Sequence, residues 1–279
     1  RCSKQRNRAL TLLSHRPEED KGLNARQLFQ KLRGAGEALN FCKIPRVEER
    51  APEIITVHND GSLKIPQNQS WSLGGFGVWW ANRDLELYPL TTNELDYALV
   101  KEVCEGLELW GGMPGHLCSS TRTEIGAGIV AICAPGPLHQ GSDNATFVRI
   151  ANWFIDRPDA KPFTPWKLMA DGDLWEVYVS LLRQKGEHAV RVSKVKAHTK
   201  EEDILKGIIT ALDRKGNGKA DGIADRGATR DGSELMALGH TYLARQKRYT
   251  YFMRLIHDLI LRVLEAFRAK RESADKAAV

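Results

Sequence analysis

The chain has 279 residues and a mass of 31.3 kDa, with 42% hydrophobic and 27% charged residues. This composition is typical of a globular protein with a buried core and excludes a fibrous or wholly disordered chain. No apolar run reaches the roughly 20 residues of a membrane-spanning helix, and the N-terminus lacks a signal-peptide pattern, so we expect no membrane partner. Five cysteines, an odd number without a CxxC pair, favour reduced thiols in an intracellular compartment, either nucleus or cytoplasm.

Charge divides the chain into three stretches. Residues 1–50 carry a net charge of +6 and residues 233–279 one of +4, whereas residues 51–232 carry −4. The sequence pI of about 9.0 indicates a nucleic-acid partner. We expect the centre to collect carboxylates for cations and the flanks to attract a polyanion, although solvated helix surfaces would give the same pattern. The chain starts at Arg1 rather than Met, which predicts a segment excised from a longer polypeptide.

The predicted elements differ between these stretches. Residues 1–50 are expected to form two short basic helices, over 8–14 and 25–38, followed by a linker. The centre opens with β-branched and alternating segments that predict an antiparallel meander of strands over 54–57, 71–80 and 86–90. Helices and strands then alternate: helices over 121–134, 145–155 and 174–184, strands ending near 142 and over 189–196, and a last helix from Asn217. A meander followed by alternation predicts an α/β fold with a mixed sheet flanked by helices.

The C-terminal stretch is predicted to be one long amphipathic helix over 241–271. Its apolar side chains recur at helical spacing: Phe252, Leu255, Ile256, Leu259, Ile260, Val263, Leu264 and Phe267. We interpret this face as packing against the central domain or a missing neighbour, with dimerisation as the alternative, since both charge signs argue against a membrane surface. We therefore expect a basic helical extension and linker over 1–50, a central domain over 51–232 and an amphipathic helix over 233–279.

Four acids in the centre have distinct settings. Asp60 ends the first predicted strand, and Glu124 lies on the first long helix. Asp143 lies where a strand meets a helix, and Asp221 opens the last helix, on the same face as Asn217 four residues earlier. Hard divalent cations take oxygen ligands, and converging carboxylates repel one another strongly without them. These acids are therefore candidate metal ligands.

Seven short motifs follow one another in the centre: Asp60-Gly61-Ser62, Gly75-Phe76-Gly77, Arg122-Thr123-Glu124, Ser142-Asp143-Asn144, Asp173-Leu174-Trp175, Val195-Lys196-Ala197-His198 and Asn217-Gly218-Lys219-Ala220-Asp221. Each is weak alone, but in this order, over residues 54–228, the series resembles the ribonuclease H family. The resemblance implies a ribonuclease H-like fold with a five-stranded mixed sheet. Asp60 would lie on the central first strand and Asp143 at the end of the neighbouring fourth strand.

The resemblance also implies an activity. The chain would be an endonuclease that hydrolyses the RNA strand of an RNA–DNA hybrid with two Mg²⁺ ions, for which Mn²⁺ is an alternative. Asp60 would bridge both ions, Glu124 and Asp143 would complete one site, and Asp221 the other. His198, on a loop after a strand, suits proton transfer or product release.

Family positions further imply which groups read the hybrid, whose 2′-hydroxyls distinguish RNA from DNA. They are the backbone amides of Gly61 and Ser62, the guanidinium of Arg122, and the side-chain amides of Asn144 and Asn217.

The sequence departs from the family pattern in several places. Residues 91–117, with a helix-like piece over 93–109, and residues 199–216, which include 201–212, are insertions with no derived role. The second insertion weakens the assignment of His198. Ser120 and Thr121 stand where the family has paired Asn residues. No Lys-rich helical protrusion is evident over 157–171, for which the basic flanks could substitute.

Other interpretations stay open. One is a catalytically silent nucleic-acid-binding or scaffold module of this fold, although such a module has no need of four clustered acids. Another is a DNA-acting nuclease or strand-transfer enzyme of the same fold. A zinc set of His116, Cys118, Cys133 and His139 lacks any standard zinc spacing. The Met-less start and basic flanks suit a retroelement polyprotein with a reverse transcriptase as partner, but a stand-alone enzyme would carry the same motifs.

Overall fold

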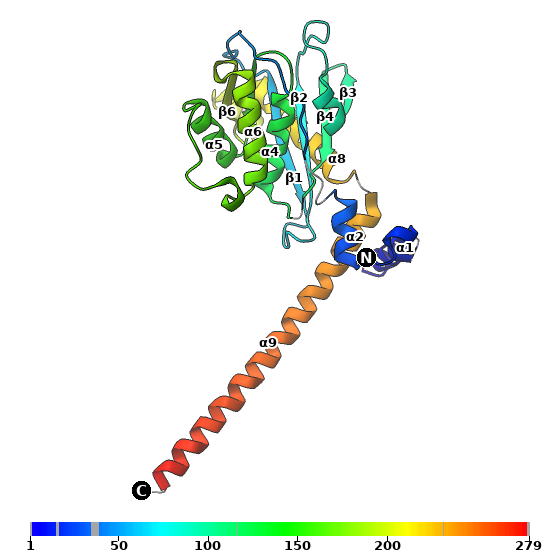
Figure 1. Cartoon of the computed structure of the whole chain (residues 1–279), viewed down its shortest axis with the longest axis vertical. Helices are drawn as coiled ribbons and strands as arrows, with labels where there is room; N and C mark the ends of the chain where they lie inside the picture. The colour runs from blue at the N-terminus through cyan, green and yellow to red at the C-terminus, as the bar shows by residue number, and fades with distance from the viewer. Residues whose placement is uncertain (1, 15–16, 35–38, 116, 231, 278–279) are drawn as a thin grey trace.

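A six-stranded mixed sheet organises the chain (Figure 1). The computed structural model describes all residues except 1, 15–16, 35–38, 116, 231 and 278–279. The strands are β1 (Val57–Lys64), β2 (Leu73–Trp80), β3 (Leu99–Val103), β4 (Gly106–Gly112), β5 (Leu138–Ser142) and β6 (Val190–Lys194). Their order is β3-β4-β2-β1-β5-β6; β1 to β4 pair antiparallel, whereas β5 runs parallel to both β1 and β6.

This arrangement confirms the predicted fold class. Asp60 lies on β1, inside the sheet, and Asp143 directly follows β5, the parallel neighbour of β1. Helical extensions precede and follow the sheet, as expected. The sheet has six strands rather than five, because the stretch after β2 adds a hairpin, β3–β4, at one edge.

Helices cover both faces of the sheet (Figure 1). On one face, α4 (Ser120–Ile132), α5 (Ala145–Ile155) and α6 (Gly172–Lys185) enclose the main apolar core, which includes Ile125, Phe147 and Trp175. On the other face, α8 (Ala211–Ala228) lies across β2, which is buried along its whole length. A Cβ at Gly77 would come within 2.4 Å of the backbone nitrogen of Ala224. The Gly-x-Gly strand therefore allows the backbones of β2 and α8 to touch.

Several predicted boundaries are wrong, each for a local reason. Residues 86–90 form no strand, because the Asp84 carboxylate accepts the backbone N–H groups of Glu86 and Leu87 and closes a turn. The helix-like piece over 93–109 is a short helix, α3 (Thr92–Tyr97), followed by the β3–β4 hairpin. The last helix of the domain begins at Ala211, not at Asn217, because Thr210 caps it there.

The N-terminal and C-terminal helices also differ in length from the prediction. The N-terminal helices are α1 (Cys2–Ser14) and α2 (Ala25–Leu32), and the predicted end of the second, 35–38, lies outside the described residues. A five-residue helix, α7 (Glu201–Leu205), occupies the second insertion. The C-terminal helix, α9 (Gly232–Ala277), is longer than predicted at both ends.

A second, smaller core joins the N-terminal extension to the start of α9. Phe29 of α2 packs edge-on against Trp71, whose ring stacks on Tyr242 of α9 at a centroid distance of 5.0 Å. Arg33 donates to the carbonyl of Ser72 at 2.8 Å and to that of Gly115. The basic N-terminal helices are thus docked on the β1–β2 connection and on α9.

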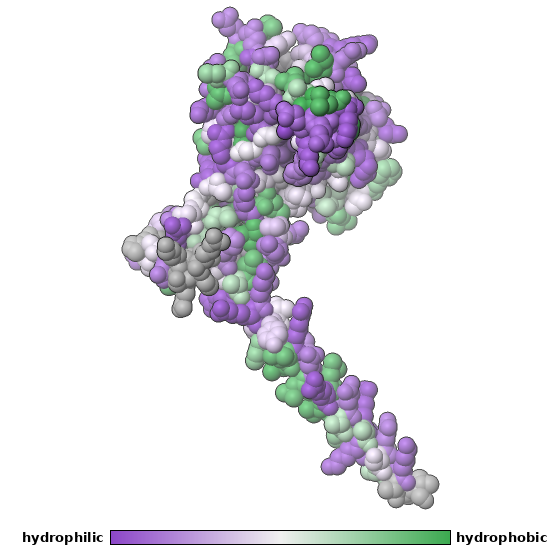
Figure 2. Space-filling model, turned by 180° about the vertical axis from the view of Figure 1, so that it is seen from behind, coloured by the Kyte–Doolittle hydropathy of each residue, from purple (hydrophilic) through white to green (hydrophobic). Residues whose placement is uncertain are grey.

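Past this small core, α9 leaves the body of the molecule (Figure 1). Its apolar side chains there form green patches in Figure 2 and are about half exposed, for example Phe252 at 56% and Phe267 at 64%. Nothing in the described part of the chain covers this predicted face. None of the helices that the structure describes combines the length and apolarity needed to cross a membrane.

Lys185 at the end of α6 is 1% exposed and donates to the carbonyls of Ala134 and Gly136. Burial lowers the pKa of its ammonium from 10.5 to about 8. Between these pH values the unfolded chain binds more protons, so folding gains stability as pH rises. We expect the unfolding free energy of the wild type, minus that of Lys185→Met, to increase by up to about 3 kcal/mol across this window. Urea unfolding at several pH values measures it; a constant difference would contradict the lowered pKa.

Candidate metal centre

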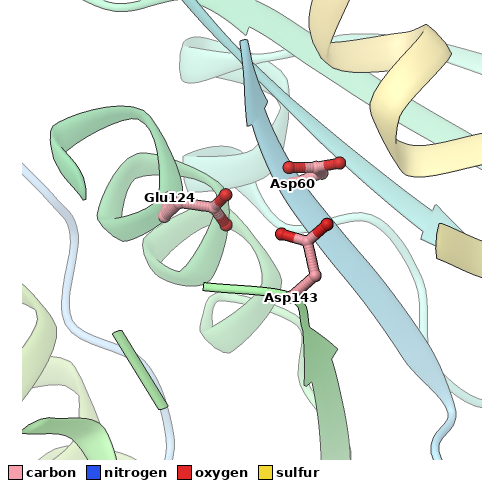
Figure 3. Close-up of side chains that lie close together, drawn as sticks. All are labelled: Asp60, Glu124 and Asp143. Carbon is pink, nitrogen blue, oxygen red and sulfur yellow. The ribbon is translucent and has the colours of Figure 1, made fainter. Parts of the chain in front are cut away.

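Three carboxylates from three different elements meet where β5 ends beside the middle of β1 (Figure 3). Asp60 comes from β1, Glu124 from α4 and Asp143 from the residue after β5, and one oxygen of each lies within 4.8 Å of the others. The parallel pairing of β1 with β5 brings Asp60 beside Asp143. Ser119 caps α4 and thereby fixes Glu124 in its second turn.

The surroundings hold these carboxylates in place but do not neutralise them. The backbone N–H of Gly61 donates to Asp60 at 2.7 Å, and the Ser142 hydroxyl donates to Glu124 at 3.2 Å. Asp60 and Glu124 are 6% and 4% exposed, and within the described residues no basic side chain forms an ion pair with any of the three acids. Such a cluster is costly as it stands.

The pKa values show this cost. Burial, and after it the charge of Asp143, raises the pKa of Asp60 to about 7. Burial and the charge of Asp60 raise the pKa of Glu124 well above its usual range. A divalent cation would offset both the burial and the mutual repulsion, and carboxylate oxygens are its preferred ligands. The residues present therefore fit a magnesium or manganese ion.

The cluster opens into a cavity of about 940 Å³. Eight of the ten residues singled out in the sequence line it: Asp60, Gly61, Glu124, Asp143, Asn144, His198, Asn217 and Asp221. Asp221 stands outside the tight group of three, but its charge adds to the rise in the pKa of Asp60. Asn217 connects α8 to the cluster, since its side-chain N–H donates to Asp143 at 3.3 Å.

Ser62 and Arg122 lie elsewhere. The Ser62 hydroxyl donates to Asp225 of α8, which also pairs with Lys64 at 2.6 Å. Arg122 makes two hydrogen bonds to the Asp173 carboxylate, at 2.8 and 2.7 Å, and lines a separate cavity of about 580 Å³. In the free protein the guanidinium thus joins α4 to α6.

His198 lies on the loop after β6, in the left-handed backbone region with φ of +49°. The loop is held on both sides: Arg214 donates to the carbonyl of Thr199 at 3.2 Å, and Lys196 pairs with Asp203 of the insertion at 2.9 Å. His198 lines the cavity, and the hydrogen bond from Arg214 joins its loop to α8.

Sequence reasoning missed the basic side chains of the cavity. Arg214, Lys215 and Lys219 line it together with Ser120 and Thr199. A signal was present, because Lys215 and Lys219 are four residues apart and bracket Asn217 on one helix. The zinc set gains no support: His139 bonds to Ser193, His116 lies outside the described residues, and within the described part only the three acids form a group that could hold a metal.

The role of Arg122 can be tested separately. We expect Arg122→Gln to lower the unfolding free energy by about 1–2 kcal/mol. The Arg122 side chain is only 8% exposed, and the substitution removes its ion pairs with Asp173 and Asp171. Urea unfolding measures this. Unchanged stability together with weakened hybrid binding would instead support the role in substrate contact.

Comparisons with known proteins show similarity in structure alone. No protein-family model and no curated protein matches the sequence. The prototype foamy virus (PFV) RNase H domain is 17% identical and covers 62% of this chain and 92% of its own, with a TM-score of 0.39. LC9-RNase H1, a type 1 RNase H with the type 2 active-site motif, is 13% identical, covers 69% of this chain and 76% of its own, and has a TM-score of 0.38.

A third similar structure is the foamy viral protease–reverse transcriptase in complex with an RNA/DNA hybrid. It is 15% identical, covers 70% of this chain and 22% of its own, and has a TM-score of 0.39. The strand order of this chain, with Asp60 on β1 and Asp143 directly after its parallel neighbour β5, is the arrangement that the sequence resemblance to ribonuclease H implies.

Proposed function

We propose that this chain is an endonuclease that hydrolyses the RNA strand of RNA–DNA hybrids. The observation that carries the proposal is the meeting of Asp60, Glu124 and Asp143 within 4.8 Å at the floor of one cavity, with Asp221 on its wall. A scaffold module would gain nothing from bringing three mutually repelling carboxylates together, two of them buried. A metal-dependent phosphodiesterase requires such a group.

The metal ligands would be Asp60, Glu124 and Asp143 for one Mg²⁺, with Asp60 and Asp221 for a second; Mn²⁺ fits the same oxygen ligands. Bound divalent cations would supply the positive charge that a phosphodiester needs as its bond to the leaving oxygen breaks. The chain's own residues keep the ligands oriented, through Gly61 on Asp60, Ser142 on Glu124 and Asn217 on Asp143.

His198 is the residue we assign to proton transfer. It borders the cavity, and its segment is held by Arg214 and by the Lys196–Asp203 pair. In our proposal a water oxygen attacks the phosphorus, the bond from phosphorus to the 3′-oxygen breaks, and the imidazole of His198 gives a proton to that oxygen. The products then carry 3′-hydroxyl and 5′-phosphate ends.

Asn217 also provides a reader of the ribose. Its side-chain N–H donates to Asp143, and its carbonyl oxygen is buried and has no hydrogen-bond partner among the described residues. A buried acceptor without a partner has lost its hydrogen bonds to water, and a donor from the substrate would replace them. We propose that it accepts a hydrogen bond from a 2′-hydroxyl, alongside Asn144, which lines the same cavity and whose side-chain oxygen caps α5.

The test compares labelled RNA–DNA hybrid, duplex RNA and duplex DNA of one sequence, each with Mg²⁺, with Mn²⁺ and with EDTA. Cleavage of the RNA strand of the hybrid, lost in EDTA, is the expected result. Cleavage of duplex DNA would support the DNA-acting nuclease, and binding without any cleavage would support the silent module. Because reverse transcription is the reaction class that produces such hybrids, a reverse transcriptase in the same polyprotein is the partner we propose.

A further inference from the structure

The β3–β4 hairpin places a carboxylate against two lysines of α8. Glu105 lies in its turn, which Gly106 closes with φ of +134°. The carboxylate pairs with Lys215 at 3.0 Å and with Lys219 at 2.6 Å. These partners are 110 and 114 positions away in the sequence, so only the added hairpin brings the charges together.

The two lysines also line the cavity of the acid centre, whereas Glu105 does not. They are one helical turn apart on α8 and bracket Asn217, whose side chain contacts Asp143. The two ammonium groups therefore lie between the acids and the hairpin. Arg214 is the third basic residue of the cavity, and its guanidinium donates to the carbonyl of Thr199.

These ion pairs can exchange partners easily. All three side chains are partly exposed, at 48% for Glu105, 45% for Lys215 and 38% for Lys219, and exposed pairs contribute little to stability. A nucleic-acid phosphate offers the same ammonium groups an anion and releases counterions as it binds. Hydrogen bonds from Lys219 and then Lys215 lower the pKa of Glu105 to about 2, so this carboxylate stays charged at neutral pH.

We propose that Lys215 and Lys219 bind backbone phosphates of the nucleic acid that enters the acid cavity, and that Glu105 competes with those phosphates for the two ammonium groups. The hairpin thereby weakens binding of any polyanion that makes no other contact with the site. This inference rests on the proposed function only in taking nucleic acid as the ligand.

The experiment measures binding to the full chain carrying Asp143→Asn, which prevents cleavage. Fluorescence anisotropy follows a short labelled hybrid, and a DNA duplex of the same sequence, over a range of KCl concentrations with Mg²⁺ present. We expect Glu105→Gln to tighten binding about three- to tenfold at low salt, since phosphates then meet no competitor. Lys215→Gln with Lys219→Gln should weaken binding about tenfold and reduce the slope of log affinity against log salt by about 2.

The matched control is Glu102→Gln, which removes an exposed carboxylate from the same hairpin; the described residues give Glu102 no ion pair. It should leave affinity nearly unchanged, and Glu105→Gln should have no effect once both lysines are Gln. Equal tightening by both Glu variants would show a general charge effect and overturn the proposal. Unchanged affinity in Glu105→Gln, or in the lysine variant, would also overturn it, provided that melting temperatures match that of the parent chain.

The binding experiment distinguishes a failure of this inference from a failure of the proposed function. A wild-type chain that cleaves no hybrid, but whose duplex binding responds to Glu105 and the lysines as described, would end the proposed activity and keep this inference. A chain that cleaves hybrid while its binding ignores all three substitutions would do the reverse.

Discussion

Asp143→Asn is expected to reduce hybrid cleavage at least about a hundredfold while hybrid binding stays within about threefold of the wild type. The substitution keeps the shape of the side chain and removes one of three charges that lie within 4.8 Å of one another. Cation binding depends on the sum of these charges, whereas binding of the duplex depends mainly on basic groups around the cavity.

A second readout needs no substrate. Without divalent cations the three acids repel one another, so Asp143→Asn should melt at a higher temperature than the wild type in EDTA. With Mg²⁺ or Mn²⁺ the wild type should gain stability by binding, and the variant should gain much less. Thermal melts with and without the ions measure both effects. A variant that melts like the wild type in both conditions would contradict the metal centre.

The control for this substitution is Asp225→Asn. Asp225 is an acid of α8 that pairs with Lys64 and Ser62 and does not line the cavity. It should keep cleavage near the wild-type rate and leave the response to Mg²⁺ intact. If Asp143→Asn cut at the wild-type rate, or if Asp225→Asn lost activity to the same degree, the assignment of the acid centre would be wrong.

Gly77→Val should be a severely damaging substitution in the sheet, with a loss of more than about 3 kcal/mol of unfolding free energy. A Cβ at Gly77 would lie 2.4 Å from the backbone nitrogen of Ala224 and 2.5 Å from the carbonyl oxygen of Ala220. Backbone atoms cannot turn away as a side chain can, so α8 would have to move off β2. Because α8 carries Asn217 and Asp221, cleavage should fall together with stability.

Gly77→Ala keeps this prediction measurable if the valine variant fails to fold. It should lose about 1–3 kcal/mol in urea unfolding, since even one methyl group meets the α8 backbone. Gly222→Ala is the matched control on α8, where a Cβ would have no neighbour within 4 Å. That change should gain up to about 1 kcal/mol, because alanine favours helix. A Gly77→Ala variant as stable as the wild type would contradict the backbone contact.

Local signals in the sequence determined the elements that carry the site. The helix over 145–155 has the bounds expected from the sequence, and Asn144 caps its first turn. The resemblance to the ribonuclease H family implied that Asp60 and Asp143 would lie on neighbouring strands, and the parallel pairing of β1 with β5 agrees with this. The first strand does not end at Asp60 as expected, but continues to Lys64. Helix caps and apolar periodicity are read within a few residues, whereas the motif series is informative only in its order along residues 54–228.

The tertiary structure decided the contacts between distant segments. Arg122 pairs with Asp173 across 51 positions, and Glu105 with Lys215 across 110, and neither pairing leaves a mark on the local pattern. The same holds for residues 99–112, whose hairpin depends on Gly106 and on pairing along β2 rather than on helical periodicity. A side chain selects its partner by which backbones pack together, and that is settled only when the whole sheet is assembled.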